Sequence, residues 1–370
     1  MNNSTETREI LSNKRKLKIS VVLFLVSAAL FLMSRYIDNF SDLYYKYIYI
    51  IVLNTIPRVF SLIPFSVYEI ILYGFSIFIL VRLIRCIYLG ITKKLSFKKI
   101  IIRATSNFLI YVSAFLFLNM IALGVNSFRT DFVTLTNLKV SNNSDEERLI
   151  EICERFKDKL NELDGKIQKD QNGFLKLDTN VRQEGRDNMK NLGKTYSFLQ
   201  GYYPIPKPYI FSKVMSYQLL EGETNFTLEA NYNNDMPQVD IPSTICHELS
   251  HVKGFINEYE ANYISFLACI NSNSYEYQYS GYFMAYSYCM SDLYYSNLDA
   301  FKKINGELSD NVKLELKNEA LFWDNYRGGI SDLYDNVYDK ILKAGGQEDG
   351  IRSYNVVVKL LMAGYGDQFE

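Results

Sequence analysis

Residues 242–262 read PSTICHELSHVKGFINEYEAN and contain both histidines of the 370-residue chain. His247 and His251 stand four residues apart, so on a helix they share one face and can bind the same zinc ion. Glu248 follows the first histidine, where a carboxylate can act as general base toward a water at that ion. The pattern predicts one Zn²⁺ per chain, with His247 and His251 as metal ligands and Glu248 as a catalytic residue.

A catalytic zinc site usually takes a third protein ligand, and no histidine remains to supply it. On one straight helix, Glu258 would lie about 10 Å along the axis from His251, too far for a shared ion. We therefore expect the helix to break at Gly254 and a second helix to return a carboxylate to the metal. Glu258 and Glu260 point about 200° apart on that second helix, so only one of them can be the ligand.

Three apolar runs precede this stretch, and each approaches, with its flanks, the ~20 residues that a helix needs to cross a bilayer. They predict a membrane anchor over residues 1–127. The expected spans cover residues 18–36, 66–86 and 105–125.

Basic residues flank the apolar runs unevenly. They gather before the first run and in the loop at residues 82–103, and they are few between the first and second runs. By the positive-inside rule the N-terminus and that loop are cytoplasmic, which places residues 128–370 outside the cytoplasm of a multi-pass membrane protein. A span within residues 40–65 would reverse this orientation. Because Pro57 and Pro64 interrupt that segment, we expect an interfacial or re-entrant piece instead.

The remainder of the chain predicts an extracytoplasmic, mainly α-helical, zincin-like α+β domain with a small sheet. Helices are expected at residues 144–163, 242–255, 258–271, 282–298, 311–325, 330–344 and 354–364. Ser144 is the predicted cap of the first of them. A short strand is expected at Phe226–Asn231, and Leu228–Asn231 is interpreted as an edge strand that binds the substrate backbone.

The overall composition excludes several classes of protein. Charged residues make up 22% and apolar residues 48%, which argues against a disordered chain. The net charge of −1 argues against a strongly basic nucleic-acid binder. Five scattered cysteines without a CxxC pair exclude a disulfide scaffold or a cysteine-based zinc site.

A tetrahedral intermediate also needs a hydrogen-bond donor for its oxyanion. Tyr282 is our candidate for this catalytic role, with Tyr279 as an alternative. Among 30 tyrosines, packing remains the alternative for either one. Arg327 could serve the same purpose, bind a substrate carboxylate, or form a structural salt bridge.

The sequence Glu258-Tyr259-Glu260-Ala261-Asn262 resembles the E-x-x-A-D element of the HtpX-like and CAAX-prenyl membrane metallopeptidases. In those gluzincins the first glutamate is the third metal ligand and the aspartate supports a ligand. The resemblance implies that Glu258 binds the metal and that Asn262 supports it. Gly254 matches the glycine of the metzincin HExxHxxGxxH pattern, whose third histidine would fall at Asn257.

A wider resemblance covers most of the chain. The chain is similar to an uncharacterised bacterial family of membrane proteins, which have a zincin signature and three spans followed by a domain. The matching blocks are residues 242–251, 279–282, 323–328 and 342–354. This resemblance implies the architecture and no substrate.

Together these features predict a membrane-anchored zinc metallopeptidase acting on a peptide or protein, with the lipid bilayer as its other partner. A membrane sensor or interaction protein with a non-catalytic domain is one alternative. A zinc amidase or esterase that acts on an envelope component is the other.

Overall fold

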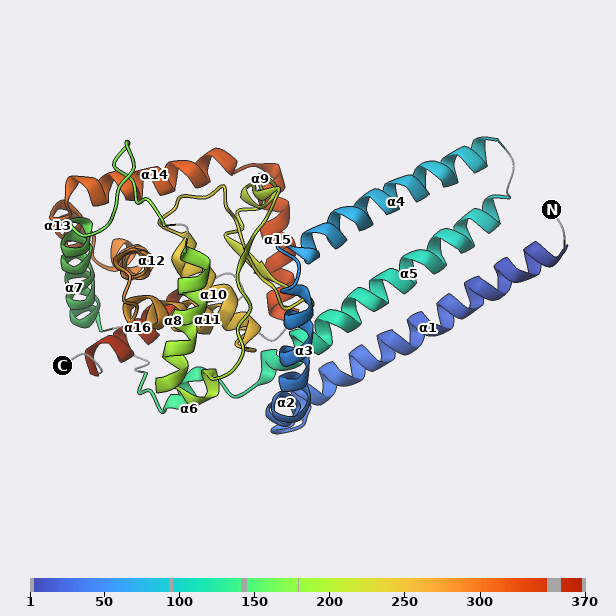
Figure 1. The fold of residues 1–370 in the computed structure, drawn as a ribbon, viewed down its shortest axis with the longest axis horizontal. Coiled ribbons are helices and arrows are strands. Elements are labelled where there is room, and N and C mark those ends of the chain that lie inside the picture. Colours follow the sequence, from blue (N-terminus) through green and yellow to red (C-terminus); the bar gives the residue numbers. More distant parts are fainter. Residues whose placement is uncertain (1–2, 93–95, 141–144, 179, 345–353, 368–370) are drawn as a thin grey trace.

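The computed structural model describes residues 3–92, 96–140, 145–178, 180–344 and 354–367 (Figure 1). Three of its helices are long and apolar enough to cross a membrane, and they extend from one side of a helical domain. They are α1 (Asn3–Tyr36), α4 (Val67–Ile91) and α5 (Phe97–Ala122). α1 packs along α5. The three expected apolar helices are confirmed, whereas the side of the membrane on which the domain lies stays a prediction.

The ambiguous segment between the first two long helices forms short helices against the domain. It consists of α2 (Phe40–Tyr44), a π-helical turn η1 (Tyr45–Tyr49) and α3 (Ile50–Phe60). These three pieces follow one another without a gap, and Tyr44, Tyr49 and Leu53 are buried in the core of the domain. The Tyr49 hydroxyl donates a hydrogen bond to the Val252 carbonyl at 2.9 Å. The guanidinium of Arg129 lies 3.6 Å from the centre of the Tyr45 ring.

The domain is mainly helical, as expected. Its helices are η2 (Gly124–Phe128), α6 (Phe132–Thr136), α7 (Glu146–Asp164), α8 (Val181–Thr195), η3 (Ser197–Leu199), α9 (Ser212–Ser216), α10 (Ile241–Val252), α11 (Glu258–Ile270), α12 (Tyr275–Ser296), α13 (Leu298–Gly306), α14 (Asp310–Tyr326), α15 (Gly329–Ala344) and α16 (Tyr354–Asp367). Ser144, the predicted cap of α7, lies outside the described residues, as do residues 345–353 of the last matching block. Asp145 caps α7 by accepting a hydrogen bond from the Arg148 amide.

α12 and α8 differ from the expectation for local reasons. α12 begins seven residues earlier than predicted, because the Ser274 side chain caps it at the Tyr277 amide. α8 was not predicted, since its sequence is polar and contains two glycines. Gly185 is needed there, because a Cβ would lie 2.3 Å from an Ile245 methyl.

The sheet has three short strands in the order β1-β3-β2. β1 (Lys207–Pro208) runs parallel to β3 (Ala230–Tyr232), and β2 (Gly222–Thr224) runs antiparallel to it. The expectation of an edge strand at Leu228–Asn231 is therefore wrong, since β3 lies in the centre. The strand also begins later than predicted, because Leu228 adopts a left-handed φ of 52°.

α10 and α11 lie at the centre of the domain. α10 contacts β2, β3, α8, α11 and α12, and α11 contacts α8, α12 and α16. Almost every residue of both helices is buried. The stretch quoted first from the sequence thus forms two helices that other elements of the domain enclose on several sides.

Candidate metal centre

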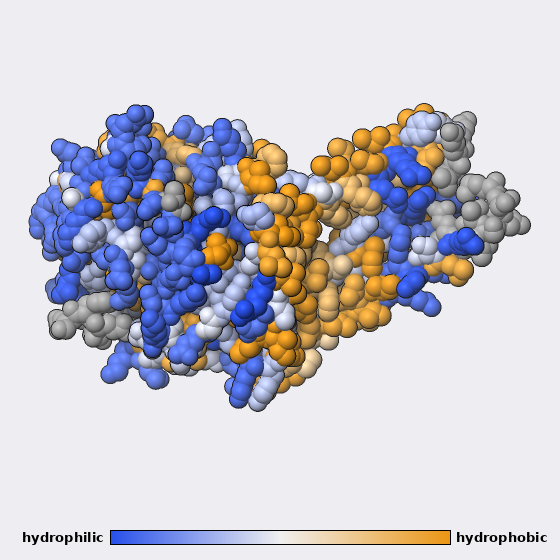
Figure 2. All heavy atoms as spheres, in the orientation of Figure 1, coloured by the Kyte–Doolittle hydropathy of each residue, from blue (hydrophilic) through white to orange (hydrophobic). Residues whose placement is uncertain are grey.

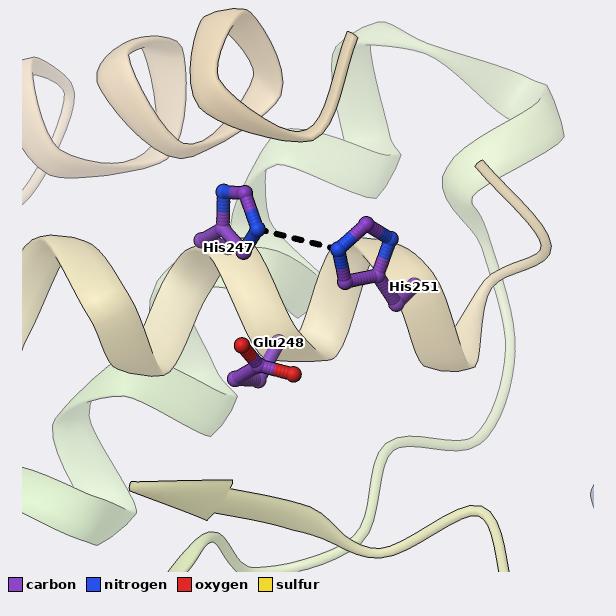
Figure 3. A group of neighbouring side chains, drawn as sticks. All are labelled: His247, Glu248 and His251. Carbon is purple, nitrogen blue, oxygen red and sulfur yellow. Dashed lines mark hydrogen bonds between the residues drawn. The ribbon is translucent and has the colours of Figure 1, made fainter. Parts of the chain in front are cut away.

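The histidine pair lies on α10, one helical turn apart. The two Nε2 atoms are 2.9 Å from each other, and the rings stand nearly perpendicular (Figure 3). α10 carries Pro242 near its first turn, where a missing N–H costs nothing. The helix thus presents the two imidazoles side by side on one face.

Each imidazole is oriented by an acceptor at its Nδ1. His251 Nδ1 lies 2.8 Å from the Phe255 carbonyl, and His247 Nδ1 lies 2.8 Å from Asn262 Oδ1. A carbonyl only accepts, so His251 carries its proton on Nδ1, and the amide oxygen of Asn262 sets the same tautomer for His247. Both Nε2 lone pairs therefore face each other, which is unfavourable unless a cation lies between them.

The chain turns back after α10, as predicted. Gly254 has φ of 80°. Its N–H bonds to the His251 carbonyl, and the Phe255 N–H bonds to the Ser250 carbonyl. This pair of bonds is a Schellman motif, which needs a residue in the left-handed region after the helix. α11 then starts at Glu258.

Glu258 brings a carboxylate to the two imidazoles. Its Oε2 lies 3.1 Å from His247 Nε2 and 3.7 Å from His251 Nε2. Ligand atoms of a tetrahedral zinc at ~2.0–2.1 Å lie about 3.3 Å from one another. The three donor atoms thus fit the spacing and the chemistry of one zinc ion, and Glu258 is the carboxylate that could complete the set.

Glu260 points elsewhere. Its carboxylate accepts hydrogen bonds from the Phe132 amide at 2.6 Å and from the Asn257 side chain at 2.7 Å. Burial raises the pKa of Glu260 to about 7, although both hydrogen bonds oppose the shift. Glu260 thus connects α11 to the start of α6, and the structure does not bring it to the histidine pair.

Glu248 lies on the side of α10 that faces the sheet (Figure 3). One carboxylate oxygen and the ligand nitrogens of His247 and His251 all lie within 4.8 Å of one another. Its Oε2 accepts a hydrogen bond from the Thr224 hydroxyl at 2.7 Å. A Cβ at Gly222 would lie only 2.5 Å from Glu248 Oε1, so β2 approaches this carboxylate closely. Burial raises the pKa of Glu248, although the two histidines and the Thr224 hydrogen bond oppose the shift.

The charges of the centre favour a cation. Burial by itself would lower the pKa of His251, but the neighbouring Glu258 carboxylate raises it to about 9. Burial would raise the pKa of Glu258, but the two imidazoles hold it well below its usual range. A positive charge is therefore stabilised among these three side chains, and either a proton or a metal ion can supply it.

The tyrosine chosen from the sequence does not lie at this centre. The Tyr282 hydroxyl pairs with that of Tyr365 at 3.4 Å, and its ring packs against Phe156 and Phe266. Tyr279 packs against Phe283 on the same helix. Both belong to the aromatic core around α12, so Tyr282 is withdrawn as the oxyanion donor. Sequence alone does not distinguish a core tyrosine from a catalytic one.

Three residues near the centre were missed. Thr224 and Gly222 on β2 contact Glu248 directly. Tyr334 on α15 lies close enough to Glu223, Glu258 and Glu248 for their charges to add to burial in raising its pKa. No motif in the sequence marks these positions, because they come from distant segments.

The family model described as "Protein of unknown function (DUF3810)" matches residues 44–362, which include α4, α5 and the candidate metal centre. No curated protein and no solved structure matches the chain.

Proposed function

The chain belongs to the DUF3810 family, and we propose that it is a membrane-anchored zinc-dependent peptidase. His247, His251 and Glu258 would hold one zinc ion, and Glu248 would be the general base. The observation that carries this proposal is the convergence of two Nε2 lone pairs and one carboxylate oxygen within 3.7 Å. Asn262 and Phe255 support it, since they assign both Nδ1 atoms as donors.

When bound, zinc would polarise a substrate carbonyl and make a neighbouring water more acidic. The chain's own residues then perform proton transfer. Glu248 would accept the proton of the attacking water and deliver it to the leaving amine. Its hydrogen bond from Thr224 at 2.7 Å fixes one of the two carboxylate oxygens.

A peptide substrate is favoured by the position of β2. This strand lies at one edge of the sheet formed by the described residues, and it contacts Glu248 through Thr224 and Gly222. An extended peptide can add to such an edge through main-chain hydrogen bonds. The backbone-binding role expected for Leu228–Asn231 is therefore transferred to β2. The gluzincin resemblance of Glu258–Asn262 agrees with peptide hydrolysis.

Metal analysis of the full-length protein tests the metal centre. The full chain is needed because Tyr49 and Arg129 contact the end of α10. We expect about one zinc per chain, and none in His247→Ala. A wild-type protein without bound metal, prepared without chelator and remaining metal-free after zinc titration, would end the zinc proposal.

The first prediction separates the base from the ligands. Glu248→Gln keeps the shape and the Thr224 contact but removes the basic carboxylate. We expect it to retain zinc and to lose at least ~10²–10⁴-fold in turnover. The measurement is zinc content together with hydrolysis of a peptide library. Zinc binding with near wild-type hydrolysis would exclude Glu248 as the base. Zinc binding by wild-type protein without hydrolysis would favour the sensor alternative.

A further inference from the structure

α15 presents an apolar stripe to the surface beside the long helices. Ile330, Leu333 and Val337 are spaced three and four residues apart, and their exposed fractions are 61%, 68% and 49%. Such spacing places them along one face of a helix. α15 lies at the side of the domain from which the long helices extend (Figure 1).

A second apolar group adjoins α4. Ile210, Phe211 and Val214 are 56%, 57% and 41% exposed. The amides of Ile210 and Phe211 donate to the Glu69 carboxylate in the first turn of α4, at 2.7 and 2.8 Å. The Phe211 ring packs edge-on against Tyr73 of α4 at 5.3 Å. This group is thus fixed against a predicted span.

A third group of exposed apolar residues lies on α3 and on the loop after it. Ile51, Val59 and Leu62 are 63%, 60% and 85% exposed. Lys207 holds both ends of the loop, because its ammonium donates to the carbonyls of Phe60 and Phe65 at 2.8 and 3.0 Å.

The three groups together are here called the apolar collar, and Figure 2 shows hydrophobic residues gathered on this side of the domain. It comprises Ile51, Val59, Leu62, Ile210, Phe211, Val214, Ile330, Leu333 and Val337.

The bilayer itself is the expected occupant of this surface. Arg103 and Ala122 lie about 28 Å apart along α5, at ~1.5 Å per residue, which nearly equals the ~30 Å of hydrocarbon. Only four residues later, Asn126 lies against Gly254 at the end of α10. The domain therefore has no stalk between it and the end of this span.

Exposed tyrosines support the same boundary. Tyr36, Tyr47 and Tyr217, near the ends of α1, α2 and α9, are 73%, 60% and 50% exposed. Tyrosine is enriched where a protein crosses from lipid to water.

The metal centre is connected to this boundary by a short chain of contacts. Glu248 accepts a hydrogen bond from Thr224 at 2.7 Å. The adjacent residue Glu223 accepts from Tyr209 at 2.8 Å and contacts the Tyr68 hydroxyl at 3.5 Å. Tyr68 lies in the first turn of α4. The base is thus separated from a predicted span by two neighbouring residues of β2.

We propose that the apolar collar lies in the interfacial region of the bilayer, and that the centre acts on polypeptide segments next to a membrane anchor. The substrate part of this proposal rests on the peptidase function proposed above. The placement of α15 in lipid does not depend on that function.

Spin labels on the full-length protein in lipid vesicles test the placement. Leu333→Cys and Leu298→Cys form a matched pair in a Cys86→Ser background, because Leu298 is a 44% exposed leucine at the start of α13, away from the long helices (Figure 1). We expect the label at position 333 to be relaxed by oxygen and shielded from water-soluble chromium oxalate, and the label at 298 to show the opposite. Equal access of chromium oxalate to both positions would overturn the placement.

A second experiment tests the substrate class. The probe is a fluorescent peptide library fused to a membrane-spanning helix, compared with the same library in solution. The double variant Ile330→Ser/Leu333→Ser should cleave the anchored library at least tenfold more slowly and the soluble library at an unchanged rate. An equal loss of cleavage rate on the anchored and the soluble library would overturn the proposed substrate class. If wild-type protein cleaves neither library, the peptidase function fails with it, and the spin-label result still decides the placement.

Discussion

The orientation of the imidazoles depends on a single acceptor at each Nδ1. For His247 that acceptor is the side chain of Asn262, one helix away. Partners of this kind fix the ring and the tautomer of a metal-binding histidine, and their loss typically weakens metal affinity by ~10–100-fold. Asn262 would therefore contribute to the proposed metal centre without touching the ion.

Asn262→Ala should weaken zinc affinity by ~10–100-fold while leaving the fold intact. Asn271→Ala is the matched control, because Asn271 stands at the end of the same helix and its side chain donates to the Leu267 carbonyl one turn earlier. Competition with a fluorescent zinc chelator measures both affinities. Equal affinities in the two variants would show that the Asn262 contact does not orient the ligand.

The two glutamates of α11 have separate roles that substitution distinguishes. Glu258→Gln should lose zinc, since it removes the charge of the third donor. Glu260→Gln should keep zinc and unfold at a lower temperature, because its amide nitrogen would meet the Asn257 side-chain donor. Metal content and melting temperature are measured on both. Loss of metal in Glu260→Gln alone would reverse the assignment.

At the scale of elements, the turn after α10 decides where the third donor lies. Gly254 has φ of 80°, and a Cβ there would lie 3.1 Å from the Tyr45 ring and 3.3 Å from Asn126. The turn is thus restricted by its backbone and by the residues that join the domain to the long helices.

Gly254→Ala should destabilise the protein by about 1 kcal/mol or more and weaken zinc binding, because the left-handed conformation is strained for alanine. Gly306→Ala is the control, since Gly306 lies at the end of α13 with nothing within 4 Å of an added Cβ. Thermal unfolding of the two variants is compared with and without zinc. A Gly254→Ala protein as stable as the control would show that the turn does not require glycine at this position.

The start of α4 is held by a buried ion pair. The Glu229 carboxylate accepts hydrogen bonds from the amides of Val67 and Tyr68, at 3.1 and 3.0 Å. It also pairs with Lys207 at 2.5 Å, and both side chains are nearly inaccessible. A negative charge at a helix N-terminus is stabilised by the helix dipole. A predicted span is therefore joined to the sheet that carries β2, so the centre and the anchor form one packed unit.

At the scale of the whole molecule, the side of the membrane on which the domain lies is still a prediction. The domain-proximal ends of α1, α4 and α5 all lie on one side of the domain, and the adjoining ends of α4 and α5, with Arg85 and Arg103, lie at the far end of the long helices (Figure 1). The positive-inside rule places that far end in the cytoplasm.

Reporter fusions after Ser127 test this orientation. An alkaline phosphatase reporter, which needs an extracytoplasmic location, should be active there. A fluorescent protein that folds only in the cytoplasm should be inactive at the same site. The opposite pattern would place the metal centre inside the cell.

Features that depend on local periodicity can be predicted from the sequence alone. The spacing of His247 and His251 places them on one helical face, and apolar runs of sufficient length predict three long helices. Gly254 marks the helix end because few other residues adopt a positive φ. These properties follow from neighbouring residues alone, and the structure contains all of them.

Features that depend on packing between distant segments follow from the fold and not from the sequence pattern. The fold placed β3 in the centre of the sheet, Tyr282 in an aromatic core, and Tyr334 near Glu248 and Glu258. It also brought Glu258 rather than Glu260 to the imidazoles, a choice that only the resemblance had suggested. Each of these features depends on which helices and strands pack against one another. The sequence pattern does not decide this, because a helix or strand of given composition can bury its side chains against many different neighbours. The sequence therefore suggests the chemistry that we propose for this centre, and the fold selects the residues that surround it.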